Sequence, residues 1–300
     1  MLSNIIGSIG LGLRREFIDE LQKLDSSHNI IQYLEIAPEN WMNMGGNKAQ
    51  QINWFSEHYP LVAHGLSLSL GGTSHLDIEF LEQIKNFIKQ YNIKLYTEHI
   101  SFTGVSGNLY DLLPIPFNQE SANNIAQRIK ITQDILGKQI AIENASYYAA
   151  SPLSTMTEPE FICEVLEKAN CLLQLDINNV YVNSRNFGFD AYKFLDVIPK
   201  NKVVYIHIAG HDEENENLLI DTHGQPVRAE VWNLLAYSYK LFGIQPTTLE
   251  RDLNMPEFSE ILSELNLIKD IQDEYKNVLA STHYTSSHIS NIENLIPIYS

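Results

Sequence analysis

The sequence predicts an α/β fold, a (β/α)8 TIM barrel, from two observations. The chain has 300 residues, of which 44% are hydrophobic and 19% are charged, so it can bury the core of one large domain. Eight short apolar runs recur along it, and amphipathic segments separate most of them. We therefore expect a single TIM-barrel domain over residues 1–300, with the barrel at about 5–280 and a C-terminal extension at about 281–300.

The predicted strands are these eight runs. Their nearly continuous apolar character is typical of parallel strands that are covered on both faces. A doubly wound sheet is the alternative. In the first run, however, Gly10 and Gly12 are followed by Arg14 and Arg15, so the third glycine of a dinucleotide-binding turn is missing. The runs begin at Ile5, Ile31, Leu61, Lys94, Gln139, Cys171, Lys202 and Thr247.

Helical periodicity marks several segments between the runs, where apolar residues recur three and four positions apart. One segment starts at Asn118, a residue type that caps helices, and ends at Gly137, a residue type that often follows the last turn. The predicted helices span 79–91, 118–137, 158–170 and 229–243.

Charge and composition disfavour several classes of protein. The formal net charge of −17 repels phosphate backbones, so we expect no nucleic-acid partner. No apolar run reaches the roughly 18 residues that span a bilayer, and the N-terminal stretch does not resemble a signal peptide, so we expect no membrane partner. Cys163 and Cys171 are the only cysteines, which is too few for a disulfide framework. These features predict a cytoplasmic protein.

Polar side chains follow the ends of six consecutive predicted strands, which is where TIM barrels place their chemistry. Each one alone has an ordinary explanation, as a hydrogen-bonded core histidine, an ion-pair partner or a turn residue. Together they would be costly to bury unless a shared cation compensated them. Imidazole and carboxylate without thiolate suit Zn, Fe or Mn, and the supply of groups favours two or three ions. The groups are His64, Glu98, His99, Glu143, Asn144, Asp176, Asn179, His207, His211, Asp221, His223, Glu250, Arg251 and Asp252.

The order and local sequence of these residues resemble the xylose-isomerase-like TIM-barrel superfamily. More specifically, the chain resembles the multinuclear non-heme iron-dependent oxidative enzyme family, whose best-known member is the oxidase of methanobactin biosynthesis. The resemblance runs from about Gly10 to Asp252. It rests on the segments GLGLR, EIAPENWM, HGLSLSLGG, TEHISF, AIENASYY, LDINNVYVN, IHIAGH, DTHGQPV, EVW and LERD.

The resemblance implies a centre of two or three iron ions, in the Fe²⁺ and Fe³⁺ states. Asn179 stands where the endonuclease relatives in the superfamily use a histidine, so its role as a ligand stays open, as does that of His211. Phe187 occupies a position where many relatives are expected to have histidine, and Glu35 and Glu39 are either supporting groups or ion-pair partners. The implied ligands are His64, His99, Glu143, Asp176, His207, Asp221, His223 and Glu250.

The resemblance also implies an O₂-dependent oxidative modification of cysteine in a ribosomally made precursor peptide, with a small companion protein presenting the peptide. Arg251 and Asp252 would orient the substrate or move a proton, with a structural ion pair as the alternative. The long connections 101–119 and 145–158, rich in aromatic residues and proline, would form the mouth for the peptide or would simply cover the barrel.

Three other functions are compatible with the same residues. The ligand types fit a zinc-dependent phosphodiesterase or other hydrolase, although the negative charge disfavours DNA as its substrate. A sugar isomerase would need a lysine near the metals, but Lys94 and Lys202 stand at strand starts. A metal-storage module would bind iron without consuming O₂.

Overall fold

The computed structural model describes residues 7–24, 29–104 and 112–284. Eight parallel strands close into a barrel in which neighbours in sequence are neighbours in space, and the last strand pairs with the first. Each predicted apolar run contains one of them, which confirms the fold class. Ile5, where the first run was predicted to begin, lies outside the described residues. The strands are β1 Ile9–Gly12, β2 Tyr33–Ile36, β3 Leu61–Gly65, β4 Tyr96–His99, β5 Ala141–Glu143, β6 Leu172–Asp176, β7 Val203–Ile208 and β10 Thr247–Leu249.

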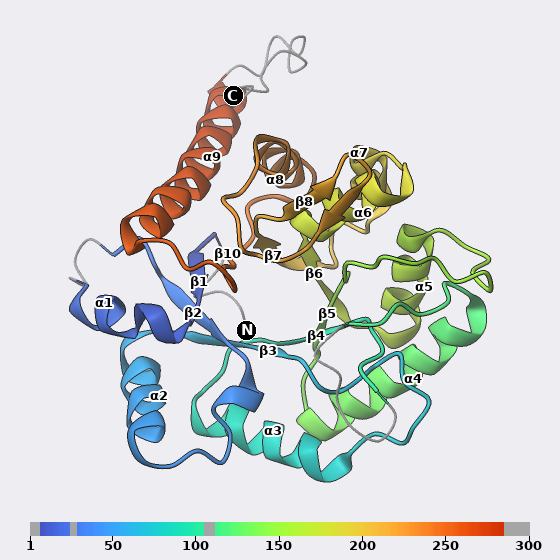
Figure 1. Cartoon of the computed structure of the whole chain (residues 1–300), viewed down its shortest axis with the longest axis horizontal. Coiled ribbons are helices and arrows are strands. Elements are labelled where there is room, and N and C mark those ends of the chain that lie inside the picture. The colour runs from blue at the N-terminus through green and yellow to red at the C-terminus, as the bar shows by residue number, and fades with distance from the viewer. Residues whose placement is uncertain (1–6, 25–28, 105–111, 285–300) are drawn as a thin grey trace.

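Helices surround the barrel, and α9 extends beyond it (Figure 1). The four predicted helices correspond to α3, α4, α5 and α8. None of the helices within the described residues is long and apolar enough to cross a membrane. The helices are α1 Ile18–Lys23, α2 Gly46–His58, α3 Ile78–Gln90, α4 Gln119–Leu136, α5 Glu158–Ala169, α6 Ile177–Phe187, α7 Ala191–Val197, α8 Ala229–Phe242 and α9 Phe258–Tyr284, with short 3₁₀ turns at Arg15–Phe17 and Pro38–Asn40.

The ends of α4 follow the predicted signals. The side chain of Asn118 accepts a hydrogen bond from the backbone N–H of Ser121 at 3.0 Å, which satisfies a donor that the first helical turn leaves free. Gly137 has a φ of 68° and so ends the helix in the left-handed conformation that glycine adopts most easily.

The structure departs from the predicted elements at two places. The run that starts at Cys171 ends as a strand at Asp176, because the Asp176 carboxylate accepts a hydrogen bond from the N–H of Asn179 at 2.6 Å and caps α6. Beyond β7, the strands β8 Asp212–Asn215 and β9 Leu218–Ile220 pair as an antiparallel hairpin. The hairpin was not predicted because the residues of β8 are polar and mostly exposed, with no alternating pattern.

The C-terminal helix crosses the predicted boundary of the barrel domain. Helix α9 continues through residue 280 to Tyr284, and residues 285–300 lie outside the described part of the chain. The extension at 281–300 therefore stays a prediction.

The side chains inside the barrel form two layers, because every second residue of a strand points to the same side. The lower layer is a cluster of buried residues, mostly apolar, separate from the larger core under the helices, and its members are Tyr33, Val62, Leu95, Ala141 and Tyr205. Gly10 makes room for it, since a Cβ there would lie 2.2 Å from the ring of Tyr33. Two positions further along the same strands stand charged or polar residues, Glu35, His64, Thr97, Glu143 and His207. The fold thus places a polar layer directly above an apolar floor.

Candidate metal centre

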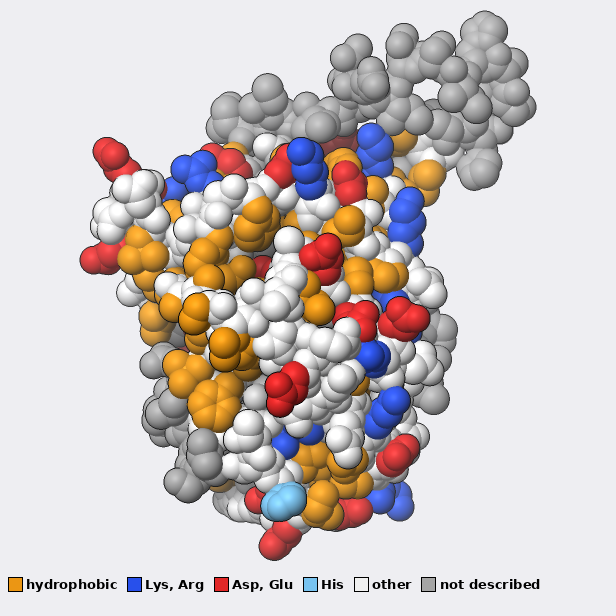
Figure 2. Space-filling view, turned by 90° about the vertical axis from the view of Figure 1, so that its right-hand side faces the viewer, with side chains coloured by type: hydrophobic (Ala, Val, Ile, Leu, Met, Phe, Trp, Pro, Cys, Tyr) orange, Lys and Arg blue, Asp and Glu red, His pale blue; other side chains and the backbone are white. Residues whose placement is uncertain are grey.

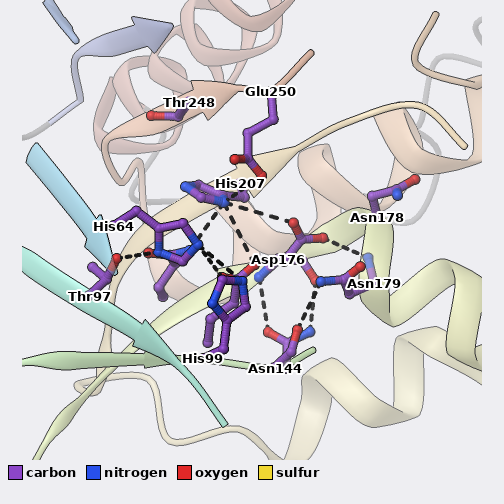
Figure 3. A network of polar contacts seen from close by, with 12 residues as sticks. His64, Thr97, His99, Asn144, Asp176, Asn178, Asn179, His207, Thr248 and Glu250 are labelled. Carbon is purple, nitrogen blue, oxygen red and sulfur yellow. Dashed lines mark hydrogen bonds and ion pairs between the residues drawn. The ribbon is translucent and has the colours of Figure 1, made fainter. Parts of the chain in front are cut away.

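The innermost ligand atoms come from β3, β4 and β5. The Nε2 atoms of His64 and His99 lie 3.1 Å apart (Figure 3). Oε2 of Glu143 lies 3.0 Å from the first and 3.2 Å from the second. All three side chains are buried. We call His64, His99 and Glu143 the inner group.

A middle group surrounds His207, at the end of β7. Its Nδ1 atom lies 2.8 Å from Oε2 of Glu250, 3.7 Å from Oε1 of Glu143 and 3.9 Å from Oδ2 of Asp176. Figure 3 shows Glu250 above and Asp176 below the side of the ring that carries this atom. The middle group consists of Glu143, Asp176, His207 and Glu250.

An outer group lies in the loops at the mouth of the barrel. The Nδ1 atom of His223 lies 2.9 Å from Oδ2 of Asp252 and 3.7 Å from Oε2 of Glu250. On the other side of the ring, Nε2 of His223 lies 2.8 Å from Oδ1 of Asp221. We call His223, Glu250 and Asp252 the outer group.

Two carboxylates connect the three groups. Glu143 belongs to the inner and middle groups, and Glu250 belongs to the middle and outer groups. A carboxylate has two oxygens and can therefore face two cations at once. Within the described residues, the three groups therefore form a row of potential metal positions in which each neighbouring pair shares one carboxylate.

Each histidine of the inner and middle groups has its second ring nitrogen held by another residue. Nδ1 of His64 pairs with the hydroxyl of Thr97 at 2.7 Å, and Nδ1 of His99 donates to the carbonyl of Gly65 at 3.2 Å. Nε2 of His207 pairs with Oε2 of Glu35 at 2.8 Å. Such contacts fix the ring orientation of metal-binding histidines and direct the other nitrogen at the ion.

Burial and neighbouring charges shift the ionisation of the inner group. Burial lowers the pKa of His99 to about 4, so its Nε2 atom carries a free lone pair at neutral pH. Burial would also lower the pKa of His64, but the charge of Glu143 raises it to about 9. Burial would raise the pKa of Glu143, whereas His99 and His64 hold it well below its usual range. A bound cation would take the place of the proton on His64.

The carboxylates of the middle group differ from one another. Burial, together with the charges of Glu143 and Asp221, raises the pKa of Asp176 well above its usual value. Burial would raise the pKa of Glu250 too, but His207 and His223 lower it to about 2. A bound cation would favour the ionised form of Asp176, because it would stabilise the carboxylate directly.

The residues fit a metal centre on geometric grounds. Oδ2 of Asp176 and Oδ1 of Asn179 are buried and make no hydrogen bond to the described residues, which is a costly state for polar oxygens. Ligand atoms about 2.1 Å from one ion stand about 3 Å apart from each other, which is the spacing found in the inner group. The donor set of imidazole and carboxylate suits iron, zinc or manganese.

A family model described as "RiPP precursor modification enzyme MbnB/TglH/ChrH" matches residues 8–273 of the sequence. The chain belongs to this family. Relatives in the MbnB/TglH/ChrH family share its length as well as its sequence. A UPF0276 protein of Acinetobacter baylyi is 48% identical over 273 residues, which are 91% of this chain and 93% of the relative. A UPF0276 protein of Pseudomonas aeruginosa is 44% identical over 272 residues, 91% of this chain and 95% of the relative.

Solved structures with low sequence identity share the barrel fold. A xylose isomerase domain protein from Planctomyces limnophilus superposes with a TM-score of 0.57 at 11% identity, covering 91% of this chain and 99% of the other. A D-psicose 3-epimerase from Clostridium cellulolyticum, solved with D-tagatose, gives a TM-score of 0.55 at 11% identity, with 92% and 98% covered. The chain therefore has the same TIM-barrel fold as these xylose-isomerase-like proteins.

Two of the predicted ligands lie beside the three groups. Asp221 contacts His223, and its carboxylate also accepts hydrogen bonds from Ser146 and Asn178 at 3.0 and 2.7 Å. Asn179 lies in the first turn of α6, where its amide nitrogen donates to the carbonyl of Asn144 at 3.0 Å. Its Oδ1 atom is buried without a hydrogen-bond partner among the described residues, so it could still face a cation. The ligand role of both residues stays a prediction.

His211 is connected to the outer group through Asn178. Its Nδ1 atom lies 2.7 Å from Oδ1 of Asn178, whose amide nitrogen donates to Asp221. Burial lowers the pKa of His211 to about 4. This chain of contacts gives His211 a supporting position behind the predicted ligands.

The three other positions that the sequence left open lie in different surroundings. Glu35 accepts hydrogen bonds from both His207 and Tyr205, so it supports the middle group. Glu39 accepts a hydrogen bond from the N–H of Leu66 at 2.8 Å. Phe187 stacks on Tyr147 with ring centroids 4.4 Å apart and belongs to none of the three groups.

The two predicted catalytic residues lie in different environments. Asp252 is in the outer group, and its side chain is 39% exposed at the mouth. Arg251 is buried, and its guanidinium donates to Glu264 of α9, which also accepts from the N–H of Val227. A catalytic role for Arg251 stays a prediction. Its observed ion pair is with Glu264, whereas Asp252 pairs with Arg14 and His223.

Arg14 contacts the outer group, although the sequence did not indicate it as a site residue. Its Nε atom donates to Oδ1 of Asp252 at 2.6 Å, and its guanidinium lies 3.9 Å from Oε1 of Glu250. A signal for this position is present in the sequence, because Arg14 is the last residue of the first predicted run. The pattern of that run, however, indicates only that the third glycine of a dinucleotide-binding turn is missing.

One of the two long loops predicted to form the mouth borders the outer group. In the loop 145–158, Ser146 donates to Asp221, and the hydroxyl of Tyr148 accepts from the N–H of Asp221 at 2.9 Å, so this loop borders the outer group. Residues 105–111 of the loop 101–119 lie outside the described residues.

Proposed function

We propose that this protein is a multinuclear non-heme iron enzyme that uses O₂ to modify a cysteine oxidatively in a ribosomally made precursor peptide. The observation that carries the proposal is the row of three His and carboxylate groups joined by Glu143 and Glu250. Membership in a family of RiPP precursor modification enzymes supports a peptide as the substrate. Zinc or manganese would fit the same donors.

The inner group would hold the most firmly bound ion. His64 and His99 point their Nε2 atoms at Glu143, and Thr97 and Gly65 keep both rings in place. Preorganised ligands lose little entropy on binding, so this position would fill first. Iron, when bound, would activate O₂ and stabilise a cysteine thiolate.

The outer group would meet the peptide. Asp252 is the most exposed residue of the three groups, and Arg14 lies against its carboxylate. Burial would raise the pKa of Asp252, but His223 and Arg14 hold it well below its usual value. An ionised Asp252 can therefore accept hydrogen bonds from backbone N–H groups of an incoming chain and orient it.

Glu143 and Glu250 would keep neighbouring ions close together. Because each is shared between two groups, oxidant and substrate bound at adjacent positions would lie within reaction distance. Asp221 and Asn179 would complete the coordination at the side of α6.

The proposed partners are a cysteine-containing precursor peptide and a small companion protein that presents it. We also propose that the reaction takes place in the cytoplasm, where a reducing environment keeps the peptide cysteine as a thiol.

The direct test combines metal analysis with peptide mass. The protein would be purified anaerobically with Fe²⁺ and co-expressed with the short cysteine-containing peptide encoded beside its gene. We expect two or three iron ions per chain and a changed peptide mass that depends on O₂. A Glu250→Gln variant should lose the activity, whereas Glu260→Gln, at an exposed position on α9, should keep it. An unchanged peptide with the metal fully loaded would contradict the proposal.

The same experiment separates the alternatives. Two or three zinc ions per chain without iron would favour a hydrolase, and bound iron without O₂ consumption would favour storage. A sugar isomerase is less well supported, because Lys202 donates to the carbonyl of Cys171 at 3.1 Å, at the opposite end of the barrel from the metal centre.

A further inference from the structure

A cavity lies outside the barrel, beside the loop that borders the outer group. Its volume is about 500 Å³, which is in the range of ligand-binding pockets. It opens between the start of α5, the end of α6 and α7, under the loop 145–158. Figure 2 shows hydrophobic side chains gathered on this side of the molecule, which is the right-hand side of Figure 1.

The walls of this cavity are aromatic. Tyr147 stacks on Phe187 and meets Phe117 edge-on, with ring centroids 5.5 Å apart. Phe189 and Met156 complete the apolar lining. Aromatic walls contact flat or flexible apolar groups well and lose little entropy on binding.

The cavity contains one buried carboxyl group, that of Glu158. The amide nitrogen of Asn183 lies 3.3 and 3.4 Å from its two oxygens. Burial raises the pKa of Glu158 to about 8, so this carboxyl group is mostly protonated at neutral pH. The other charged side chains that line the cavity, Glu160, Asp190 and Lys193, are exposed to solvent, so the buried part of the wall offers no charge to balance a charged occupant.

One loop connects the cavity with the metal centre. Tyr147 lines the cavity, and its neighbours Ser146 and Tyr148 both contact Asp221. Asn183 holds the N–H of Tyr147 at 3.1 Å and also contacts Glu158. The same three consecutive residues, 146–148, therefore contact both the outer group's neighbour Asp221 and the cavity.

We propose that this cavity binds an uncharged apolar side chain, aromatic or long aliphatic, of the same peptide whose cysteine reaches the metal centre. The identity of the occupant, a side chain of the substrate peptide, rests on the proposed function. It makes the cavity a specificity site, because a peptide with a charged or small residue at the matching position would bind more weakly.

The first test uses small probes and needs no turnover. N-acetylphenylalanine amide, N-acetylleucine amide and N-acetylserine amide would be titrated calorimetrically into the full-length protein as purified. We expect the first two to bind at least about tenfold more tightly than the serine amide. Equal binding of all three would overturn the proposal.

Variants locate the binding. Ala150→Trp fills the cavity and should weaken binding of the phenylalanine amide at least about tenfold, whereas Ala49→Trp on α2, across the barrel, should leave it unchanged. Phe187→His keeps a flat ring but makes the wall polar, and we expect a smaller loss. Loss of binding in Ala49→Trp as well, or none in Ala150→Trp and Phe187→His, would contradict the site.

The second test uses the peptide. With wild-type protein that modifies its peptide, Ala150→Trp should lower kcat/KM at least about tenfold, mainly through KM, and exchange of the peptide's apolar residue for serine should do the same. An unaffected KM would overturn the proposal while the proposed function stands. If the wild type left the peptide unmodified, the proposed function would be contradicted, and so would the peptide as the occupant of the cavity. The amide titration would still show whether the cavity binds apolar side chains.

A lower solution mass of Ala150→Trp than of wild type would instead identify the cavity as a contact between two copies.

Discussion

The inner and outer groups use the same side-chain types but differ in how they are held. In the inner group, neutral partners, the hydroxyl of Thr97 and the carbonyl of Gly65, fix the two rings, and all three ligands are buried on strands. In the outer group, carboxylates flank His223 on both ring nitrogens, and its backbone has a left-handed φ of 51° in a loop. Strand-borne ligands are more rigid than loop-borne ones, so the inner position should bind its ion more tightly.

The largest effect is expected for Glu143→Gln, because this carboxylate serves two groups. Loss of its charge should remove about two metal ions per chain and lower the activity by at least about 10³-fold. Metal analysis and peptide mass spectrometry measure both quantities. The exposed Glu167→Gln serves as the control. A full metal content in Glu143→Gln would refute the shared position.

The next largest effect is expected for Asp252→Asn, which changes the outer group alone. We expect about one ion per chain to be lost, with activity lowered about 10- to 100-fold and the inner position still filled. Asp134→Asn, an exposed change on α4, controls for the loss of one negative charge. If Asp252→Asn lost as much metal as Glu143→Gln, the two groups would not differ as we infer.

A smaller effect is expected for Thr97→Val, which removes the hydroxyl that holds His64. The ring keeps its position on β3 but loses its fixed orientation, so metal affinity at the inner group should fall about tenfold. Metal titration with a competing chelator measures this change. An unchanged affinity would mean that packing alone orients the ring.

Glu158 shows how a buried carboxylate behaves without basic neighbours, in contrast to Glu143. The folded-state pKa of about 8 exceeds the unfolded value near 4.5, so the protonated form contributes stability that is full below about pH 4.5 and is lost as pH rises through 8. At pH 9 the free energy of unfolding of Glu158→Gln should therefore exceed that of wild type. The difference should be about 1.4 kcal/mol for each pH unit that separates the folded-state and unfolded-state pKa values. At pH 5 the two proteins should have similar free energies of unfolding. Chemical denaturation at both pH values tests this, and equal stabilities at pH 9 would contradict it.

The smallest effect on turnover is expected for Arg251→Lys. Because Arg251 pairs with Glu264 in the core next to α9, the substitution should cost about 1–3 kcal/mol of stability but change the rate less than about threefold. A large loss of rate in a stably folded variant would restore the predicted catalytic role of Arg251.

Much of the fold could be predicted because its signals are local. Each apolar run and each amphipathic stripe reports on a few adjacent residues, and the caps at Asn118 and Gly137 act within one turn. The hairpin β8–β9 and the start of α6 were not predicted, since an exposed polar strand has no alternation and the α6 cap depends on one side chain, Asp176.

The sequence by itself determined which residues stand at the strand ends, because the period of a strand and the order of the barrel units fix that. It did not determine their grouping. Only the tertiary structure decided that Glu143 and Glu250 are shared, that Arg14 joins Asp252 while Arg251 turns to Glu264, and that Phe187 lines an aromatic cavity. The physical reason is that these contacts join residues up to 238 positions apart. Such distances are set by how the barrel closes and where its loops fold back, and no local pattern records them.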